Sequence, residues 1–135
     1  MSHLFAVGIR RFALLLGAVF TVALLSACSQ SPESVAKSYI QTVADNRVEE
    51  AVGYFSLADV KENDLTMVKG KCQMIVGEQY SIMQSKGGLD SVTTTLDDQK
   101  DNTAHVTIEM KYKNGETKKD SLTLVKDSGK WKIKL

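Results

Sequence analysis

The sequence predicts an α+β domain in which three helices precede a four-stranded antiparallel sheet. Apolar residues recur every three to five positions between residues 35 and 83, which is the spacing of a helix face. From about residue 92 to the end they alternate with polar residues, as in half-buried strands. Gly87-Gly88 separates the two patterns. Helices segregated onto one face of an antiparallel sheet make an α+β fold.

The first helix is predicted to begin at Pro32 and to end near Asp45. Ser31 is suited to cap the first free N–H groups, Pro32 has no N–H that needs a partner there, and Glu33 suits the positive end of the helix dipole. One apolar face follows along this helix, formed by Val35, Tyr39, Ile40 and Val43.

The second helix is predicted to be short and to begin after Asn46. Asn46 and Glu49 have the spacing of a capping box, in which each side chain bonds the other residue's backbone N–H. The apolar face of this helix is expected to comprise Val48, Ala51, Val52 and Phe55.

The third helix is predicted to be the longest. It follows a loop over residues 56–63 and continues, despite Gly70 and Gly77, until Gly87-Gly88 stops it. Its apolar stripe is expected to contain Leu65, Val68, Cys72, Ile75, Val76, Gln79 and Met83. A place on this stripe makes Cys72 a reduced core cysteine, with a redox or metal role as the alternative.

Four strands complete the predicted domain. The inward residues are expected to be Val92, Thr94 and Leu96, then Val106, Ile108, Met110 and Tyr112, then Leu122 and Leu124, and finally Trp131, Ile133 and Leu135. Asn114-Gly115 should form a tight hairpin turn, because both residues tolerate a positive φ. Asp127-Ser128-Gly129 marks the last turn.

The first 27 residues have the three parts of a secretory signal peptide. Arg10 and Arg11 precede an apolar run over residues 12–25, and the small residues Ser26 and Ala27 follow it. The run is shorter than the roughly 20 residues that a permanent membrane helix needs. The paired arginines leave twin-arginine export open as an alternative to the general secretory route.

The sequence Leu25-Ser26-Ala27-Cys28 resembles the lipobox of bacterial lipoproteins. The resemblance implies cleavage before Cys28, a thioether-linked lipid on its sulfur and anchoring in a bacterial membrane. The chain then divides into a signal peptide over residues 1–27, a lipidated cysteine with a short tether over 28–31, and one domain over 32–135. A disulfide between Cys28 and Cys72 is the alternative. By resemblance to enterobacterial lipoproteins, Ser29 favours the outer membrane, facing the periplasm, over the inner membrane.

Charge argues against binding to nucleic acid. Two of the 17 basic residues lie in the leader, so the mature chain carries 15 basic and 16 acidic side chains. Residues 111–135 nevertheless hold eight lysines against Glu116, Asp120 and Asp127. These lysines suit either an acidic partner or a solvated sheet face protected from aggregation.

A resemblance to a known superfamily rests on the order of elements and on three segments. These are Ala104-His105-Val106-Thr107-Ile108, the Asn114-Gly115 hairpin, and the ending from Val125 through Gly129-Lys130-Trp131-Lys132-Ile133. Together they resemble small bacterial lipoproteins of unknown function in the nuclear transport factor two-like superfamily. The resemblance implies a cone-shaped domain, with a curved sheet around a long helix. The large ring of Trp131, near the chain end, is expected to fill the open side between sheet and helices.

Three functions are compatible with this reading. The first is a noncatalytic binding module for an apolar ligand or an envelope protein, and the ligand version requires that Met74, Met83 and Trp131 leave the cone open. The second is a structural or inhibitory module that docks through the lysine-rich sheet.

The third is an isomerase or lyase of the superfamily type, which is expected least. Its loose candidates are Asp90 or Glu78 paired with Tyr39, Tyr54, Tyr80 or Tyr112. With His105 as the only histidine of the mature chain, and expected on the solvated face, no zinc site or catalytic triad with a spare histidine can be built. Glu49-Glu50 and Asp97-Asp98 are interpreted as solvated carboxylates. No catalytic residue, metal or cofactor is therefore predicted, and the chain is expected not to be an enzyme.

Overall fold

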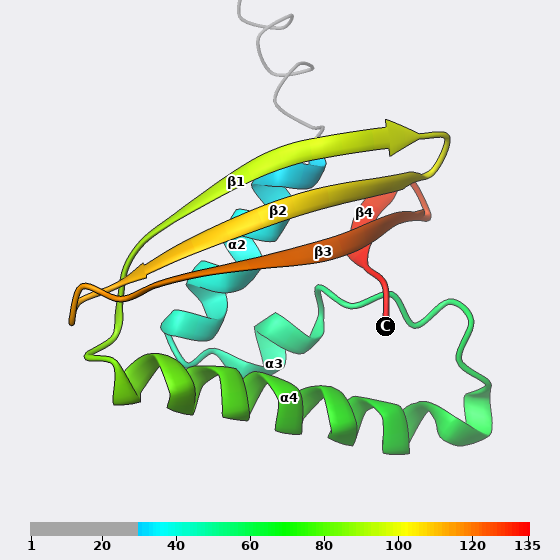
Figure 1. The fold of residues 1–135 in the computed structure, drawn as a ribbon. Helices are drawn as coiled ribbons and strands as arrows, with labels where there is room; N and C mark the ends of the chain where they lie inside the picture. The colour runs from blue at the N-terminus through cyan, green and yellow to red at the C-terminus, as the bar shows by residue number, and fades with distance from the viewer. Residues whose placement is uncertain (1–29) are drawn as a thin grey trace, which may run out of the picture. The chain divides into compact units, whose positions relative to one another are not determined.

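The computed structural model describes residues 30–135, and residues 31–135 form one compact unit. The predicted signal peptide and Cys28 lie outside the described residues. The elements in chain order are α2 (Pro32–Ala44), α3 (Val48–Val52), the 3-10 helix η1 (Glu62–Asp64), α4 (Leu65–Ser85), β1 (Leu89–Lys100), β2 (Thr103–Tyr112), β3 (Thr117–Asp127) and β4 (Lys130–Ile133) (Figure 1). Within this part of the chain, no helix is both long and apolar enough to span a bilayer.

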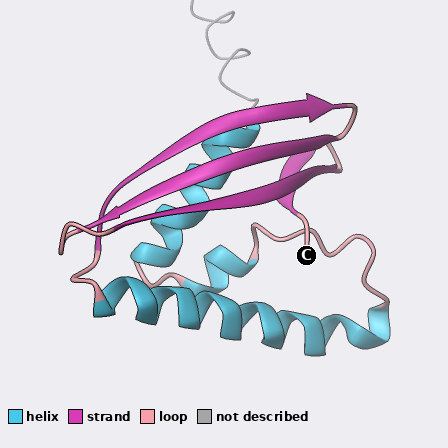
Figure 2. Ribbon diagram, in the orientation of Figure 1, coloured by secondary structure: helices cyan, strands magenta, loops and turns pink. Residues whose placement is uncertain are grey.

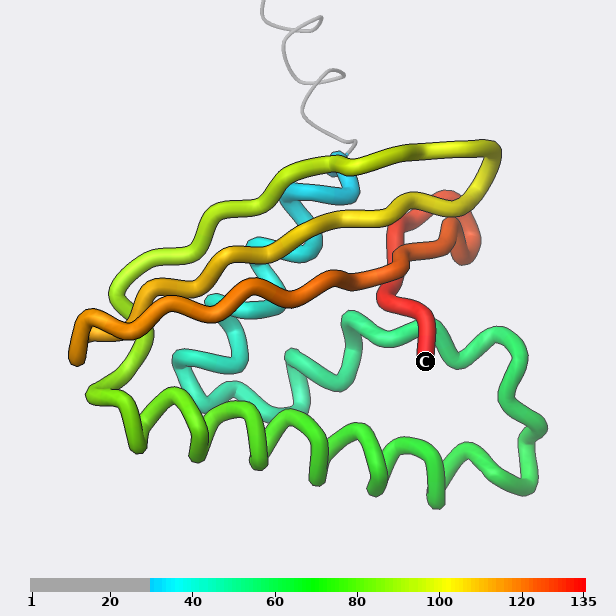
Figure 3. The backbone as a smooth tube through the Cα atoms, viewed as in Figure 1, coloured from blue at the N-terminus to red at the C-terminus, as the bar shows by residue number. Residues whose placement is uncertain are grey.

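The four strands form one antiparallel sheet in the order β1-β2-β3-β4. Helices and strands form separate layers, with the sheet at the top of Figure 2, α4 at the bottom and α2 running from one to the other (Figure 2). The long strands β1 to β3 curve together, as the tube in Figure 3 shows (Figure 3). This arrangement confirms the predicted α+β fold with its helices on one face of a four-stranded sheet.

Helix α2 begins and ends as predicted. The Ser31 hydroxyl accepts a 3.2 Å hydrogen bond from the backbone N–H of Ser34, and Pro32 occupies the first turn. The apolar stripe is buried throughout, from Val35 through Tyr39 to Val43. The sequence pattern was sufficient here because capping and apolar spacing favour the same helix.

The predicted capping box at Asn46 is wrong. Asn46 has a φ of 57° and donates its N–H to the carbonyl of Val43, while the Arg47 N–H bonds Thr42. These two bonds close the end of α2 rather than the start of α3. Asn46 serves this turn because asparagine tolerates the left-handed conformation better than most residues. Phe55, assigned to the second helix, lies beyond it and forms a bridge with Ile133.

Helix α4 is as long as predicted but carries apolar residues on two sides. Cys72, Val76 and Met83 are buried, as the spacing predicts. Ile75, which the same spacing places on this stripe, is 41% exposed. Met74 is 75% exposed and does not contribute to the interior. The helix stops at the glycine pair as expected, because the Gly87 and Gly88 N–H groups bond the carbonyls of Gln84 and Met83.

The strands differ from prediction in two details. In the β2–β3 turn only Gly115 takes a positive φ, of 91°, while the Asn114 side chain accepts the Glu116 N–H at 2.9 Å. Asn114 therefore supports the turn through a side-chain bond rather than through an unusual backbone angle. Leu135, predicted to face inward, follows the end of β4 and is 54% exposed, because no strand partner holds the chain terminus against the core.

Candidate functional site

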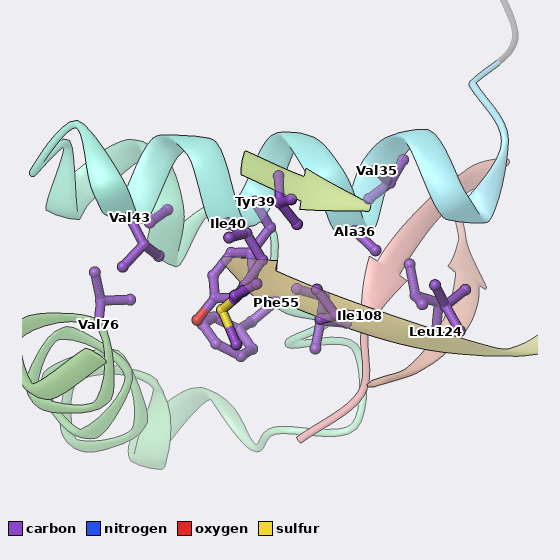
Figure 4. Packing of buried hydrophobic residues seen from close by; sticks show 14 of the residues in the cluster. Val35, Ala36, Tyr39, Ile40, Val43, Phe55, Val76, Ile108 and Leu124 are labelled. Atoms are coloured by element: carbon purple, nitrogen blue, oxygen red, sulfur yellow. The ribbon is translucent and has the colours of Figure 1, made fainter. Parts of the chain in front are cut away.

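The space between α2, α4 and the sheet is the first place to look for a site, and apolar side chains pack into it. Tyr39 contacts Phe55 edge to face, with ring centroids 5.4 Å apart. Ile108 of β2 and Val76 of α4 are buried around this pair, as the close view shows (Figure 4). Further buried residues of the same cluster are Cys72, Met83, Met110, Leu124 and Trp131.

One partly buried polar contact joins two of the helices around this interior. The Tyr39 hydroxyl donates a 2.7 Å hydrogen bond to Oε1 of Gln79, which joins α2 to α4. Burial raises the pKa of Tyr39 to about 12, against the lowering effect of the bond to Gln79. At neutral pH the hydroxyl is therefore a neutral donor that is already engaged. Among the described residues, every buried polar side-chain atom that is shielded from solvent has a hydrogen-bond partner.

The structure does not bring the loose enzyme candidates together. Asp90 and Glu78 are both exposed, and neither hydrogen-bonds a tyrosine. Tyr112 is buried in the sheet, where its hydroxyl contacts the sulfur of Met110 at 3.8 Å. Among the described residues, no carboxylate forms a hydrogen bond with a tyrosine hydroxyl, which is the pairing that the enzyme hypothesis needs.

Cys72 lies on the buried side of α4, as predicted. It is a free cysteine with 1% of its surface exposed, and burial raises the pKa of its thiol. A buried neutral thiol is a poor nucleophile and a poor metal ligand. Its position is consistent with a packing role in the core.

His105 lies on the outer face of the sheet, where alternation places it, and it has partners that the sequence did not indicate. Its Nδ1 lies 2.6 Å from Oδ1 of Asp98, and the Thr107 hydroxyl donates to Asp97 at 2.6 Å. A register shift between Leu96 and Asp98 turns both aspartates toward β2. The described residues contain no group of three side chains that could hold a metal ion.

A partly open groove of about 310 Å³ lies between the loop after α3, the end of β3 and the two residues that follow β4. The groove is lined by Ser56, Ala58, Asp59, Val60, Val125, Lys126, Asp127, Lys134 and Leu135. The Ser56 N–H donates a 2.8 Å bond to the Ile133 carbonyl, and its hydroxyl lies 3.4 Å from Asp127. These contacts fix one wall of the groove against β4.

The groove was not found from the sequence. Its walls come from a loop without periodic pattern and from residues near the end of the chain, more than 60 positions away, so no local signal marks it. The lysine-rich ending does contribute to it, through Lys126 and Lys134. Several lysines of this region have neighbours. The Lys126 ammonium lies 5.4 Å from the centroid of the Trp131 ring, Lys119 lies 3.8 Å from Glu109, and Lys132 donates to the Gly53 carbonyl at 2.6 Å.

Comparison with known proteins gives a family and a fold. The family model described as Domain of unknown function (DUF4878) matches residues 26–134. A solved structure from Campylobacter jejuni, named "Putative NTF2-like transpeptidase", is similar with a TM-score of 0.73 at 20% identity, over 78% of this chain and 99% of that one. At this identity the likeness supports the NTF2-like fold. No curated protein matches the chain.

Proposed function

The chain belongs to the DUF4878 family, and we propose that it is a noncatalytic binding module that holds a segment of an envelope protein while lipid on Cys28 anchors it in a bacterial membrane. The anchor rests on the lipobox-like sequence Leu25-Ser26-Ala27-Cys28. Thioether-linked and amide-linked acyl chains together hold a protein far more firmly than one chain does. An outer-membrane location facing the periplasm follows from Ser29 and belongs to the same proposal.

The observation that carries the binding role is the groove beside β4. Its volume of about 310 Å³ reaches the lower end of the range for binding sites, and its lining mixes apolar and charged groups. Ala58, Val60, Val125 and Leu135 offer apolar contacts. Polar contacts are offered by two lysines and two aspartates, which are Lys126, Lys134, Asp59 and Asp127. A polypeptide has both kinds of group along its length.

A protein segment suits this groove better than an apolar small molecule. Apolar ligands are held by burying most of their surface, which a partly open groove with four charged side chains does poorly. The interior offers little for the ligand version either, because the side chains that face it, from Tyr39 to Met83 and Trp131, pack against one another. The proposal shares one feature with docking through the lysine-rich sheet, because two lysines of that region, Lys126 and Lys134, line the groove.

Site-specific photocrosslinking in living cells tests the proposal. A photoreactive amino acid at Asp59, in the groove, is expected to give a discrete crosslink to an envelope protein, and Ala58→Trp, which fills the groove, should abolish it. Ser91→Trp, on an exposed strand position outside the groove, is the matched control and should leave the crosslink intact.

Two outcomes would contradict the proposal. A crosslink that persists unchanged in Ala58→Trp would place the partner elsewhere. Native mass spectrometry of the gently extracted protein that finds a bound lipid, retained in the wild type and lost in Ala58→Trp, would replace the protein segment by an apolar ligand.

A further inference from the structure

Helix α4 carries a second apolar stripe that faces away from the core. Met67 is 55% exposed, Met74 75%, Ile75 41% and Ile82 38%, and these are four of the five large apolar residues that are exposed in the described chain. A helix turns by about 100° per residue, so these four side chains, with the exposed Lys71 and Glu78 between them, lie within an arc of about 100°. Four exposed large apolar side chains on a single helix indicate an interaction surface.

The order of residues along this stripe is symmetric about the point between Met74 and Ile75. Met67 and Ile82 lie equally far from that point, one on each side, and both are apolar. Lys71 and Glu78 also lie equally far from it, and their charges are opposite. In either direction along the helix, the order of residue types is therefore apolar, charged, apolar, apolar, charged, apolar. Only the sign of the two charges depends on the direction.

A twofold axis requires such a pattern. In an isologous pair of antiparallel helices each residue meets the residue at the mirrored position of the other copy. Here the axis would place Met67 against Ile82, Met74 against Ile75, and Lys71 against Glu78, with each pairing made twice. Apolar side chains then meet apolar ones, and both charged groups find the opposite charge.

We propose that a second copy of this chain docks on this surface, through an antiparallel pairing of the two α4 helices centred between Met74 and Ile75. A membrane surface fits less well, because Glu78 lies within the stripe and would face anionic headgroups. A partner protein with an acidic surface would pair with Lys71 but not with Glu78, and a basic one would do the opposite. A second copy offers the opposite charge to both residues.

The size of the surface predicts a weak dimer. A 21-residue helix is about 32 Å long and about 10 Å wide, so one chain contributes on the order of 300 Å² to the pairing. The two chains together bury about 600 Å², which is less than the roughly 1,000 Å² in total that stable complexes bury. Confinement of both copies to one membrane raises their effective concentration, so pairing is best tested where the protein is anchored.

Disulfide crosslinking between two differently tagged full-length copies in bacterial membranes tests the register. Met67→Cys in one copy and Ile82→Cys in the other are expected to crosslink, because mirrored positions approach within disulfide range. The matched control, Met67→Cys in both copies, should not crosslink, since the two cysteines would be separated by about 22 Å along the helices. Crosslinking of the control pair as efficiently as the mirrored pair would overturn the proposal, as would no crosslink above background in the mirrored pair.

A charge exchange tests the pairing of Lys71 with Glu78 by an independent route. Lys71→Glu in both copies creates two like-charged contacts and should weaken pairing by about tenfold. Glu78→Lys in both copies should do the same. One copy with Lys71→Glu and the other with Glu78→Lys restores both opposite-charge contacts, and the crosslink should return.

All four side chains that are changed are exposed, so unchanged melting temperatures would show that the variants still fold. Failure of the mixed pair to recover, in variants that melt as the wild type does, would overturn the proposal. Equal crosslinking of all charge variants would do so too. The effective concentration of the two copies rests on the proposed lipid anchor, so palmitate labelling of the tagged chains is checked first. Because these experiments leave the groove unaltered, pairing that fails in labelled chains is separate from a failure of the proposed function.

Discussion

The Tyr39 hydroxyl donates a 2.7 Å hydrogen bond to Oε1 of Gln79 and so ties α2 to α4 across the core. Tyr39 is 1% exposed, whereas Gln79 is only partly buried. Removing one partner of this bond is therefore expected to cost a different amount of stability from removing the other. If the tyrosine hydroxyl is removed, water can hydrogen-bond Gln79 instead. If Gln79 is removed, the buried Tyr39 hydroxyl has little access to water and is left without an acceptor.

This asymmetry predicts the outcome of a double-mutant cycle. Gln79→Leu leaves a buried hydroxyl without an acceptor and should lower the free energy of unfolding by about 2 kcal/mol. Tyr39→Phe should cost about 1 kcal/mol or less. The double variant should be no less stable than Gln79→Leu alone, because no polar group is then left unpaired. Urea denaturation gives these free energies, and strictly additive losses would argue against a coupled pair.

The same hydroxyl predicts a loss of stability at alkaline pH. Its pKa is raised to about 12 in the folded chain, from 10.0 for an ordinary tyrosine, so the unfolded chain releases this proton first. Stability from this group is full below pH 10 and falls as the pH rises toward 12, by on the order of 2 kcal/mol. Lysines also titrate there, so the measurement is the difference between wild type and Tyr39→Phe. Parallel losses in both proteins would contradict the assignment to Tyr39.

The fold was predictable from the sequence where independent signals agreed. The Ser31 cap, Pro32 and the apolar spacing all favour one start for α2, and the glycine pair at 87 and 88 marks the end of α4. The order of helices and strands follows from the change in periodicity near residue 89. These features depend only on neighbours along the chain.

The prediction was wrong where one pattern is compatible with two structures. Asn46 suits both a helix start and a helix end, and only the position of α2 decides between them. Ile75 and Met74 are apolar but exposed. Because α4 has apolar residues on two sides, the spacing of apolar residues in its sequence does not show which side is buried. The groove beside β4 joins segments far apart in sequence, so no local pattern could predict it.

The role of Asn46 leads to a test by substitution. Asn46→Gly should keep or slightly raise stability, because glycine adopts a φ of 57° without strain. Asn46→Val should cost about 1 to 2 kcal/mol, since a β-branched side chain is strained there. Glu49→Ala should change stability by less than about 0.5 kcal/mol, because Glu49 makes only an exposed bond to Gln73. A larger loss in Glu49→Ala than in Asn46→Val would restore the capping-box interpretation.

The lipid anchor is tested at its attachment atom. Cys28→Ser removes the only sulfur at the end of the leader, so the precursor is expected to remain uncut and to incorporate no labelled palmitate. Cys72→Ala, which removes the other cysteine, is the control and should still be labelled and processed. Incorporation of palmitate into the Cys28→Ser chain would refute the lipoprotein assignment.

Burial of Cys72 predicts that its thiol is protected from reagents in the folded chain. The side chain is 1% exposed and its pKa is raised by burial, so both access and thiolate formation are limited. A thiol reagent should modify Cys72 slowly in buffer and quickly in urea, with a native rate set by opening of the α4 helix. Met74→Cys, two residues further along the helix at a position that is 75% exposed, provides a fast-reacting reference in the same protein. Equal rates at the two positions without denaturant would show that α4 is not held against the core as the structure has it, and the Tyr39 to Gln79 bond would then carry little of the predicted coupling.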